Sequence, residues 1–118
     1  MRHLKKSQKF HRTEEERRRL WIDLSTGLIK NGQIKTFTVR AKWFRPRFER
    51  LVTLCKRAGD NTQLAYRKIR PFLSEDTARI LVETIAPKYI DRNGGYTQQY
   101  KLSREFSQYD TSLVKLVD

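Results

Sequence analysis

The chain has 118 residues, of which 26 are Lys or Arg and 13 are Asp or Glu, giving a formal net charge of +13. Its length suits one domain, and hydrophobic residues (37%, with 11% aromatics) suffice for a small core. We expect neither a membrane protein nor a secreted one, because the sequence lacks both a long apolar run and a secretory signal. A single cysteine, Cys55, excludes an internal disulfide, which is typical of a protein from a reducing compartment. Together with only two histidines, it leaves too few ligands for a structural zinc site.

The positive charge is concentrated in the first half of the chain. Residues 1–57 carry 17 Lys or Arg and 5 acids, whereas residues 58–118 carry 9 and 8, so the two parts have charges of +12 and +1. Such a one-sided charge repels itself unless an anionic partner covers it, so we expect a polyanion as the partner. Residues 1–12 hold five Lys or Arg, no acid and few apolar residues, which predicts an extended basic arm ahead of a single domain at 13–118.

Two elements are predicted directly after the arm. Thr13 and Glu16 form a capping box, and the apolar stripe that follows predicts a helix over 14–30. Gly32 supplies the left-handed residue that ends such a helix. The alternation over 33–37 predicts a short strand.

A second helix is predicted over 39–57, with Thr38 as its cap. Pro46 leaves two alternatives: the helix kinks there, or its regular part begins there. Apolar residues at helical spacing form the expected buried face, and cations form a stripe elsewhere on the helix. The buried face comprises Phe44, Phe48, Leu51, Val52 and Cys55, and the stripe comprises Arg40, Arg47, Arg50 and Arg57, with Lys42, Arg45 and Lys56 nearby.

The second half predicts shorter elements. Asp60 is expected to cap a helix of about 61–70, and Ser74 another that Pro87 ends. The buried side of the latter is expected to comprise Ile80, Leu81, Thr84 and Ile85. Strands near 96–102 and 113–117 follow, joined by a polar linker at 103–111. The whole predicts an α+β fold: about four helices against a small three-stranded mixed sheet, with an extended basic amino-terminal arm.

The inventory of reactive groups does not favour catalysis. His3 and His11 lie in the arm, where nothing holds a general base against a substrate. Cys55 lies on the apolar face of the second helix, where cysteine is usually an inert hydrophobe. Residues 14–16 are three consecutive glutamates, but their position at a helix start already accounts for them. We therefore expect no enzyme, no catalytic residue, no cofactor, no metal site and no small-molecule substrate.

The turn from Arg92 to Thr97 leaves two interpretations open with equal weight. Adjacent glycines at 94 and 95 let the backbone approach a phosphate, and Arg92 and Asn93 add side-chain donors, so the turn could bind an anion. Alternatively, it is a plain loop leading into a strand.

Several segments together resemble the family of bacterial large-subunit ribosomal protein seventeen. They are Met1-Arg2-His3 with Lys5, Lys6, Lys9 and Arg12-Thr13; Leu28-Ile29 with Gly32-x-Ile34-x-Thr36; Arg40-Ala41-Lys42, Arg45-Pro46, Glu49-x-Leu51-Val52-Thr53 and Lys56; and Ala86-Pro87-x-Tyr89 with Asp91-Arg92-Asn93-Gly94-Gly95-Tyr96-Thr97. The resemblance covers most of the chain. It implies a structural protein of the large ribosomal subunit that contacts ribosomal RNA and neighbouring ribosomal proteins, in a cytoplasmic or organellar ribosome.

From the charge pattern and this resemblance we expect an RNA-binding surface that contacts mostly phosphate and 2′-hydroxyl groups. Aromatic side chains at Phe10 and Trp43, and the two histidines, are candidates to stack on exposed bases. A nucleoid-type DNA-binding protein is the alternative, and an RNA-modifying enzyme is a third option. The expected RNA-binding residues are Arg2, His3, Lys5, Lys6, Lys9, His11, Arg12, Arg17, Arg18, Arg40, Lys42, Arg45, Arg47, Arg50, Arg92, Asn93 and Gly94.

Overall fold

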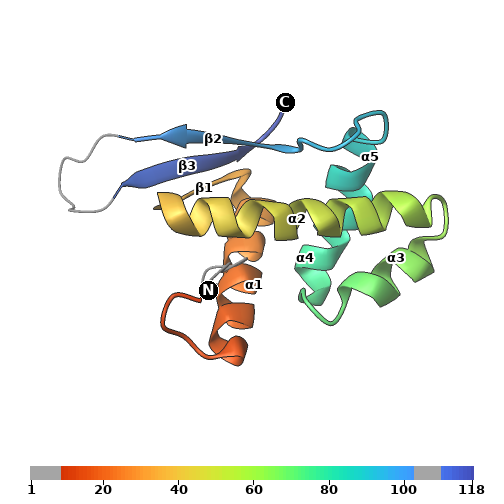
Figure 1. Ribbon diagram of the computed structural model, residues 1–118. Coiled ribbons are helices and arrows are strands. Elements are labelled where there is room, and N and C mark those ends of the chain that lie inside the picture. The colour runs from red at the N-terminus through yellow and green to blue at the C-terminus, as the bar shows by residue number, and fades with distance from the viewer. Residues whose placement is uncertain (1–8, 103–109) are drawn as a thin grey trace, which may run out of the picture.

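The computed structural model describes residues 9–102 and 110–118. Its helices and strands, in chain order, are α1 (Glu14–Asn31), β1 (Gln33–Phe37), α2 (Thr38–Ala58), α3 (Thr62–Ile69), α4 (Glu75–Ile80), the π-helical segment η1 (Leu81–Ile85), α5 (Ala86–Lys88), β2 (Thr97–Lys101) and β3 (Thr111–Leu116). The sheet lies along one side of α2, and α1, α3 and α4 lie on the other (Figure 1). This arrangement confirms the α+β fold class. Predictions for residues 1–8 and for most of the linker at 103–111 fall outside the described residues. None of the helices described is long and apolar enough to cross a membrane.

Helix α1 has the ends that its sequence predicts. The Thr13 hydroxyl accepts a hydrogen bond from the backbone N–H of Glu16 (3.2 Å), and the Glu16 carboxylate accepts one from the N–H of Thr13 (3.1 Å). These bonds satisfy two amides that a helix start otherwise leaves without a partner. At the other end, Gly32 has a φ of 79° and donates its N–H to the carbonyl of Leu28, as expected of a left-handed cap.

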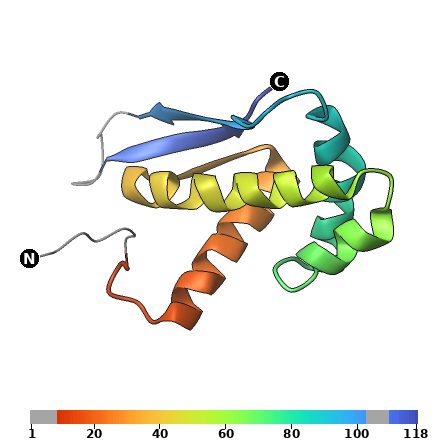
Figure 2. The ribbon, with the colours of Figure 1, turned by 45° about the vertical axis from the view of Figure 1, so that its right-hand side comes forward.

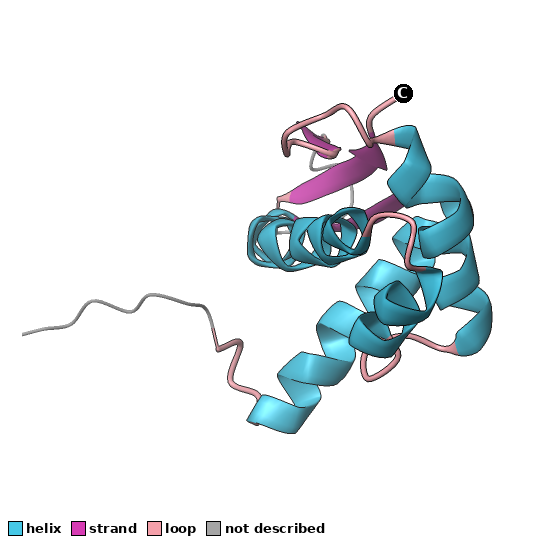
Figure 3. Ribbon diagram, turned by 90° about the vertical axis from the view of Figure 1, so that its right-hand side faces the viewer, coloured by secondary structure: helices cyan, strands magenta, loops and turns pink. Residues whose placement is uncertain are grey.

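Helix α2 is the central element of the fold. It contacts all three strands as well as α1, α3, η1 and α5, and Figure 3, which looks nearly along its axis, shows it between the sheet and the other helices. It begins at Thr38 and passes through Pro46, so the helix does not start at the proline. All five predicted apolar positions are buried. They are Phe44, Phe48, Leu51, Val52 and Cys55.

The predicted caps of α2 and α3 are wrong. Phe37 occupies the cap position of α2 and makes no side-chain capping hydrogen bond, and the hydroxyl of Thr38 instead shares a hydrogen bond with that of Ser112 on β3 (2.7 Å). The chain enters α2 directly from β1, so the side chain of Thr38 lies close enough to the sheet to bond there instead of capping the helix. At α3, the carboxamide oxygen of Asn61 accepts from the N–H of Leu64 (3.1 Å). Asp60 lies one residue too early to reach that amide.

The helix that Ser74 caps continues beyond its predicted end. Ser74 accepts from the N–H of Thr77 as expected, but the helical path runs through η1 and α5 to Lys88. The N–H of Ala86 donates to the carbonyl of Leu81, five residues back, so a wider turn precedes Pro87 and the helix accommodates the proline. Thr84, predicted to be buried, is exposed.

The sheet is wholly antiparallel rather than mixed. Its strand order is β1-β3-β2, and β3 runs opposite to both neighbours. A parallel pair needs a crossover of about a dozen residues or more, and the connection between β2 and β3, although long for a hairpin loop, falls below that length. In the register of the strands, Val114 lies between Ile34 and Gln99. Val114 and Ser112 are fully buried on the same face of β3.

The last residues before α1 are attached to the body by an aromatic contact. The chain turns at Phe10 and His11, both with positive φ (56° and 54°), and the ring of Phe10 packs edge-on against Trp43 with centroids 5.2 Å apart. Figure 2 shows this segment turning toward the amino-terminal end of α2. Phe10, which the sequence places in the basic arm, therefore packs against the core. Trp43 is only 7% exposed, so it is part of the core and not a platform for a base.

We expect the substitution Phe10→Ala to lower the free energy of unfolding by about 1 to 2 kcal/mol, because it removes both buried apolar area and an edge-to-face ring pair. Chemical denaturation monitored by circular dichroism measures this loss. The control is Lys9→Ala, at an exposed position in the same turn, which should change stability by less than about 0.5 kcal/mol. Equal stability of the Phe10→Ala variant and the parent chain would contradict an anchoring role.

Candidate nucleic-acid interface

The structure brings many of the predicted RNA-binding residues to three places. The first is a cavity of about 330 Å³ between α1, α2 and the α3–α4 turn, which we call the arginine cavity; it is lined by Glu14, Arg17, Arg18, Trp21, Trp43, Arg47 and Phe72. The second is a groove of about 520 Å³ at the start of α2, the α2 groove; it is lined by Phe10, His11, Phe37, Thr38, Val39, Arg40, Lys42, Lys101 and Asp110. The third is the turn at 92–97, which leads into β2.

The arginine cavity brings two neighbouring arginines of α1 together with a third from α2, about thirty residues later in the sequence. Arg17 and Arg18 come from the first turns of α1, and Arg47 comes from the middle of α2. Arg17 donates to the carbonyl of Arg12, Arg18 to that of Pro71 (2.9 Å), and Arg47 to that of Trp43 (2.7 Å). A guanidinium has five N–H groups, so each keeps donors for a ligand while its position is fixed.

Aromatic rings also support two of these cations. The guanidinium of Arg47 lies 4.3 Å from the centroid of the Trp43 ring, and that of Arg18 lies 5.7 Å from the ring of Phe72. Burial, together with the charges of Arg50 and Arg17, lowers the pKa of Arg47. The cluster thus carries repulsion that an anion would relieve. Glu14 is the one acid among the residues that line the cavity.

The α2 groove combines apolar surface with cations. Phe37 and Val39 are exposed apolar residues (38% and 51%), and the guanidinium of Arg40 lies 5.1 Å from the centroid of the Phe37 ring. Phe10 lines this groove, and its partner Trp43 lines the arginine cavity. The aromatic contact between Phe10 and Trp43 therefore connects the linings of the two cationic hollows.

The turn at 92–97 is fixed against α2 by polar side chains. One carboxylate oxygen of Glu49 accepts from the N–H of Gly95 (3.1 Å), and the other accepts from the hydroxyl of Thr97 (2.8 Å). Arg92 folds back, donating from Nε to the carbonyl of Gly95 (3.1 Å). These contacts favour a structural role for the turn, one of the two interpretations left open by its sequence. The position of Glu49 on a helix gave no signal of this role.

Two cations predicted near the basic stripe also hold the turn. Arg45 donates from Nε to the Thr97 hydroxyl and from Nη2 to its carbonyl (both 2.9 Å). Lys56 donates to the carbonyl of Arg92 and to the phenol of Tyr96. Burial alone would raise the pKa of Tyr96, but the hydrogen bonds with Lys56 and Thr53 outweigh it and lower that pKa. Arg45 thus joins α2 to β2, and its contact with RNA stays a prediction.

The predicted RNA-binding residues differ in exposure. Lys9, His11, Arg18, Lys42, Arg50, Arg92 and Asn93 are exposed, whereas Arg12, Arg17, Arg40, Arg45, Arg47 and Gly94 are partly buried. Arg2, His3, Lys5 and Lys6 lie outside the described residues. Within 9–102 and 110–118, the ion pairs join Arg79 to Glu75, Lys101 to Asp110 and Lys115 to Asp118, so none uses a cation of α1 or α2.

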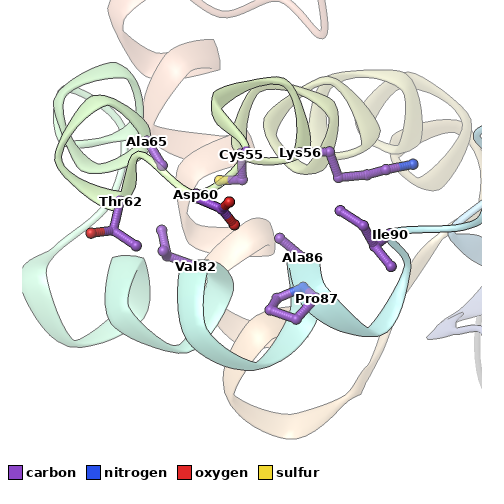
Figure 4. Close-up of a pocket in the computed structure, with 10 residues that line it drawn as sticks. Cys55, Lys56, Asp60, Thr62, Ala65, Val82, Ala86, Pro87 and Ile90 are labelled. Carbon is purple, nitrogen blue, oxygen red and sulfur yellow. The ribbon is translucent and has the colours of Figure 1, made fainter.

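A further cavity of about 360 Å³ lies at the opposite end of α2 (Figure 4). Cys55 and Asp60 lie on one side of it, and Val82, Ala86 and Pro87 lie on the other. Burial raises the pKa of the Cys55 thiol to about 11, so the thiol stays protonated and is a poor nucleophile near neutral pH. Among the described residues, no cluster of three His, Cys, Asp or Glu side chains could hold a metal ion.

Comparisons with known proteins give one consistent result. A family model described as "Ribosomal protein L17" matches residues 20–117. Curated relatives named "Large ribosomal subunit protein bL17" include one from Persephonella marina, 42% identical over 88% of this chain and 83% of its own length. Another, from Clostridium acetobutylicum, is 41% identical over 80% of this chain and 81% of its own length. A third, from Sphingopyxis alaskensis, is 37% identical over 100% of this chain and 84% of its own length.

We expect Thr97→Val to lower the free energy of unfolding by about 2 kcal/mol, because it leaves Glu49 and Arg45 each without one hydrogen bond at a site where Thr97 is 3% exposed. Urea denaturation measures the difference. The control is Thr84→Val on the exposed side of η1, which should have an effect below about 0.5 kcal/mol. A similar destabilisation of both variants would contradict the special role of the Thr97 hydroxyl.

The raised pKa of Cys55 predicts slow alkylation of the folded chain. The shift from 9.0 to about 11 lowers the thiolate fraction at pH 8 about a hundredfold relative to an ordinary thiol. Iodoacetamide should therefore modify the native chain at least that much more slowly than the chain in guanidinium chloride, as followed by mass spectrometry. The native rate should rise as the pH increases toward 11. Equal rates for the folded and unfolded chains would show that the thiol is accessible and ionised.

Proposed function

Because the chain belongs to the ribosomal protein L17 family, we propose that it is a structural constituent of the large ribosomal subunit that binds ribosomal RNA and supports subunit assembly and translation. The curated relatives are named as large-subunit proteins, and the chain matches most of the length of each. The family is one of ribosomal structural proteins, and a role in the ribonucleoprotein follows from it. Binding to RNA, and the residues that perform it, are our proposal.

The observation that carries this proposal is the convergence of cations from α1 and α2. Arg17 and Arg18 meet Arg47 at one cavity, and the Coulombic influence of Arg50 on Arg47 extends the positive field along α2. Among the described residues these cations form no ion pair with an acid of the chain. A surface of this kind favours a polyanion, and ribosomal RNA is the polyanion of the particle in which this family works.

The mode of binding follows from the geometry of RNA. An A-form helix hides its base edges in a deep, narrow major groove, so the exposed cations Lys42 and Arg50 are assigned to phosphate and 2′-hydroxyl groups. Residues 1–12 act as an arm that joins the body at Phe10, and residues 13–118 form the globular domain. Because Phe10 packs on Trp43, we place the junction between arm and body next to the arginine cavity and the α2 groove.

The second half of the chain has a different task in this proposal. Its net charge is only +1, and some of its cations are engaged within the chain, as in the pairs of Arg79 with Glu75 and Lys115 with Asp118. We assign the binding of neighbouring ribosomal proteins to this half, where repulsion is weak. The place of action is the ribosome, in the cytoplasm or in an organelle.

Neutralising exposed cations of α2 should reduce the salt dependence of RNA binding. For the double variant Lys42→Gln and Arg50→Gln, the slope of log affinity for large-subunit RNA against log salt should become shallower by roughly 0.7 to 0.9 for each phosphate that the variant no longer neutralises. Filter binding over a range of salt concentrations measures the slope.

The matched control is Arg79→Gln on α4, because Arg79 is also exposed but is paired with Glu75. Its slope should equal that of the parent chain. An unchanged slope in the α2 variant would place the RNA on another face. Sedimentation distinguishes the alternative of a nucleoid protein, since a chain that works in the ribosome migrates with the large subunit and not with the chromosome.

A further inference from the structure

We infer that the arginine cavity receives one unpaired nucleotide of the bound RNA, with its phosphate on the arginines and its base against the aromatic wall. This inference rests on the proposed function and adds to it a defined site with a defined ligand. It differs from the general docking of a basic surface on a duplex, because it assigns a place to a single nucleotide unit.

The phosphate side of the site is built from guanidinium groups that are already positioned. Arg18 and Arg47 each combine a hydrogen bond to a carbonyl with the support of an aromatic ring. Arg17 is held by the carbonyl of Arg12. Because these interactions fix the cations before a ligand arrives, little side-chain freedom is given up on binding. Guanidinium forks also match phosphate oxygens in pairs, which a lysine ammonium does not.

The base side of the site is aromatic. Trp21 and Phe72 line the cavity, are only partly buried, and have ring centroids 5.3 Å apart. Unpaired bases in RNA are commonly recognised by stacking on aromatic side chains or on guanidinium planes. Glu14, also in the lining, supplies an acceptor for the N–H groups of a base.

The size and shape of the cavity favour a nucleotide over a bare ion or a helix. Its volume of about 330 Å³ lies at the lower end of the range for pockets that hold small organic ligands, so a phosphate ion would leave most of it unfilled. An A-form duplex presents a convex surface with its bases stacked inside. A hollow with both cations and rings is complementary to a base that has left the stack.

Both tryptophans of the chain, Trp21 and Trp43, line this cavity, so intrinsic fluorescence reports on its occupation. Titration of the full chain with a short single-stranded oligoadenylate should change this fluorescence with saturation. An oligonucleotide of equal length that lacks its bases should bind about tenfold more weakly, because it cannot stack. The variants Arg18→Gln and Arg47→Gln should each bind the oligoadenylate about tenfold more weakly than the parent chain.

The matched control is Arg57→Gln, which removes an exposed cation of α2 outside the lining and should leave the affinity within about twofold of the parent chain. Unchanged circular dichroism and thermal transitions establish that each variant is folded, and either arginine variant alone suffices for the comparison. Equal binding of the base-free oligonucleotide, or equal weakening in Arg57→Gln and in the cavity variants, would overturn the assignment.

Binding of the same proteins to large-subunit RNA separates this inference from the function on which it rests. If the parent chain binds that RNA but the oligoadenylate arms give the overturning result, only the nucleotide site falls. If the parent chain binds neither, the proposed RNA-binding function falls with it. Weakened binding of Arg47→Gln to both ligands, with Arg57→Gln unaffected on the oligoadenylate, supports the site.

Discussion

The hydroxyl of Thr97 is the point at which the sheet is fixed to α2. It donates to Glu49 and accepts from Arg45, so both side chains of the helix hold one residue at the start of β2. β2 pairs only with β3 in the described sheet, and β3 in turn pairs with β1. β2 and β1 each pair with β3 in a defined register. Holding Thr97 against α2 therefore also sets which side of β3 faces the helix. Apolar packing adds to this polar attachment, because Val114 on β3 is fully buried.

One consequence is a division of tasks among the cations of α2. Arg45 and Lys56 make intramolecular hydrogen bonds to residues 92–99. Arg47 shares the arginine cavity with residues of α1, while Arg50 remains exposed. A helix has enough directions around its axis to serve a core, a sheet and a charged surface at once. Hydrogen bonds to the nearly neutral second half therefore fix the side chains of Arg45 and Lys56, two cations of the first half.

Local patterns in the sequence predicted what local physics determines. The capping box of Thr13 and Glu16, the left-handed Gly32 and the 3.6-residue periodicity from Phe44 to Cys55 each depend on neighbours within a few turns. Some errors arose where distant residues decide: Ser112 accepts or donates the hydrogen bond of the Thr38 hydroxyl, and Thr97 engages Arg45 across 52 positions of sequence. Other errors were local, since the cap of α3 lies one residue after Asp60 and a π-helical turn accommodates Pro87. The same limit applies to the site: all three arginines were predicted to bind RNA, but only the packing of α1 on α2 brings them to one cavity.

The strand order β1-β3-β2 also has a consequence for synthesis of the chain. Of the three strands described, the two outer ones are translated first, yet each pairs only with residues 111–116, the third of them in chain order. Helices with local contacts form quickly, whereas strand pairs distant in sequence form slowly and expose their edges until they close. Closure of the sheet is thus a late event, because β3 can pair with β1 and β2 only after α1 to α5 have been translated.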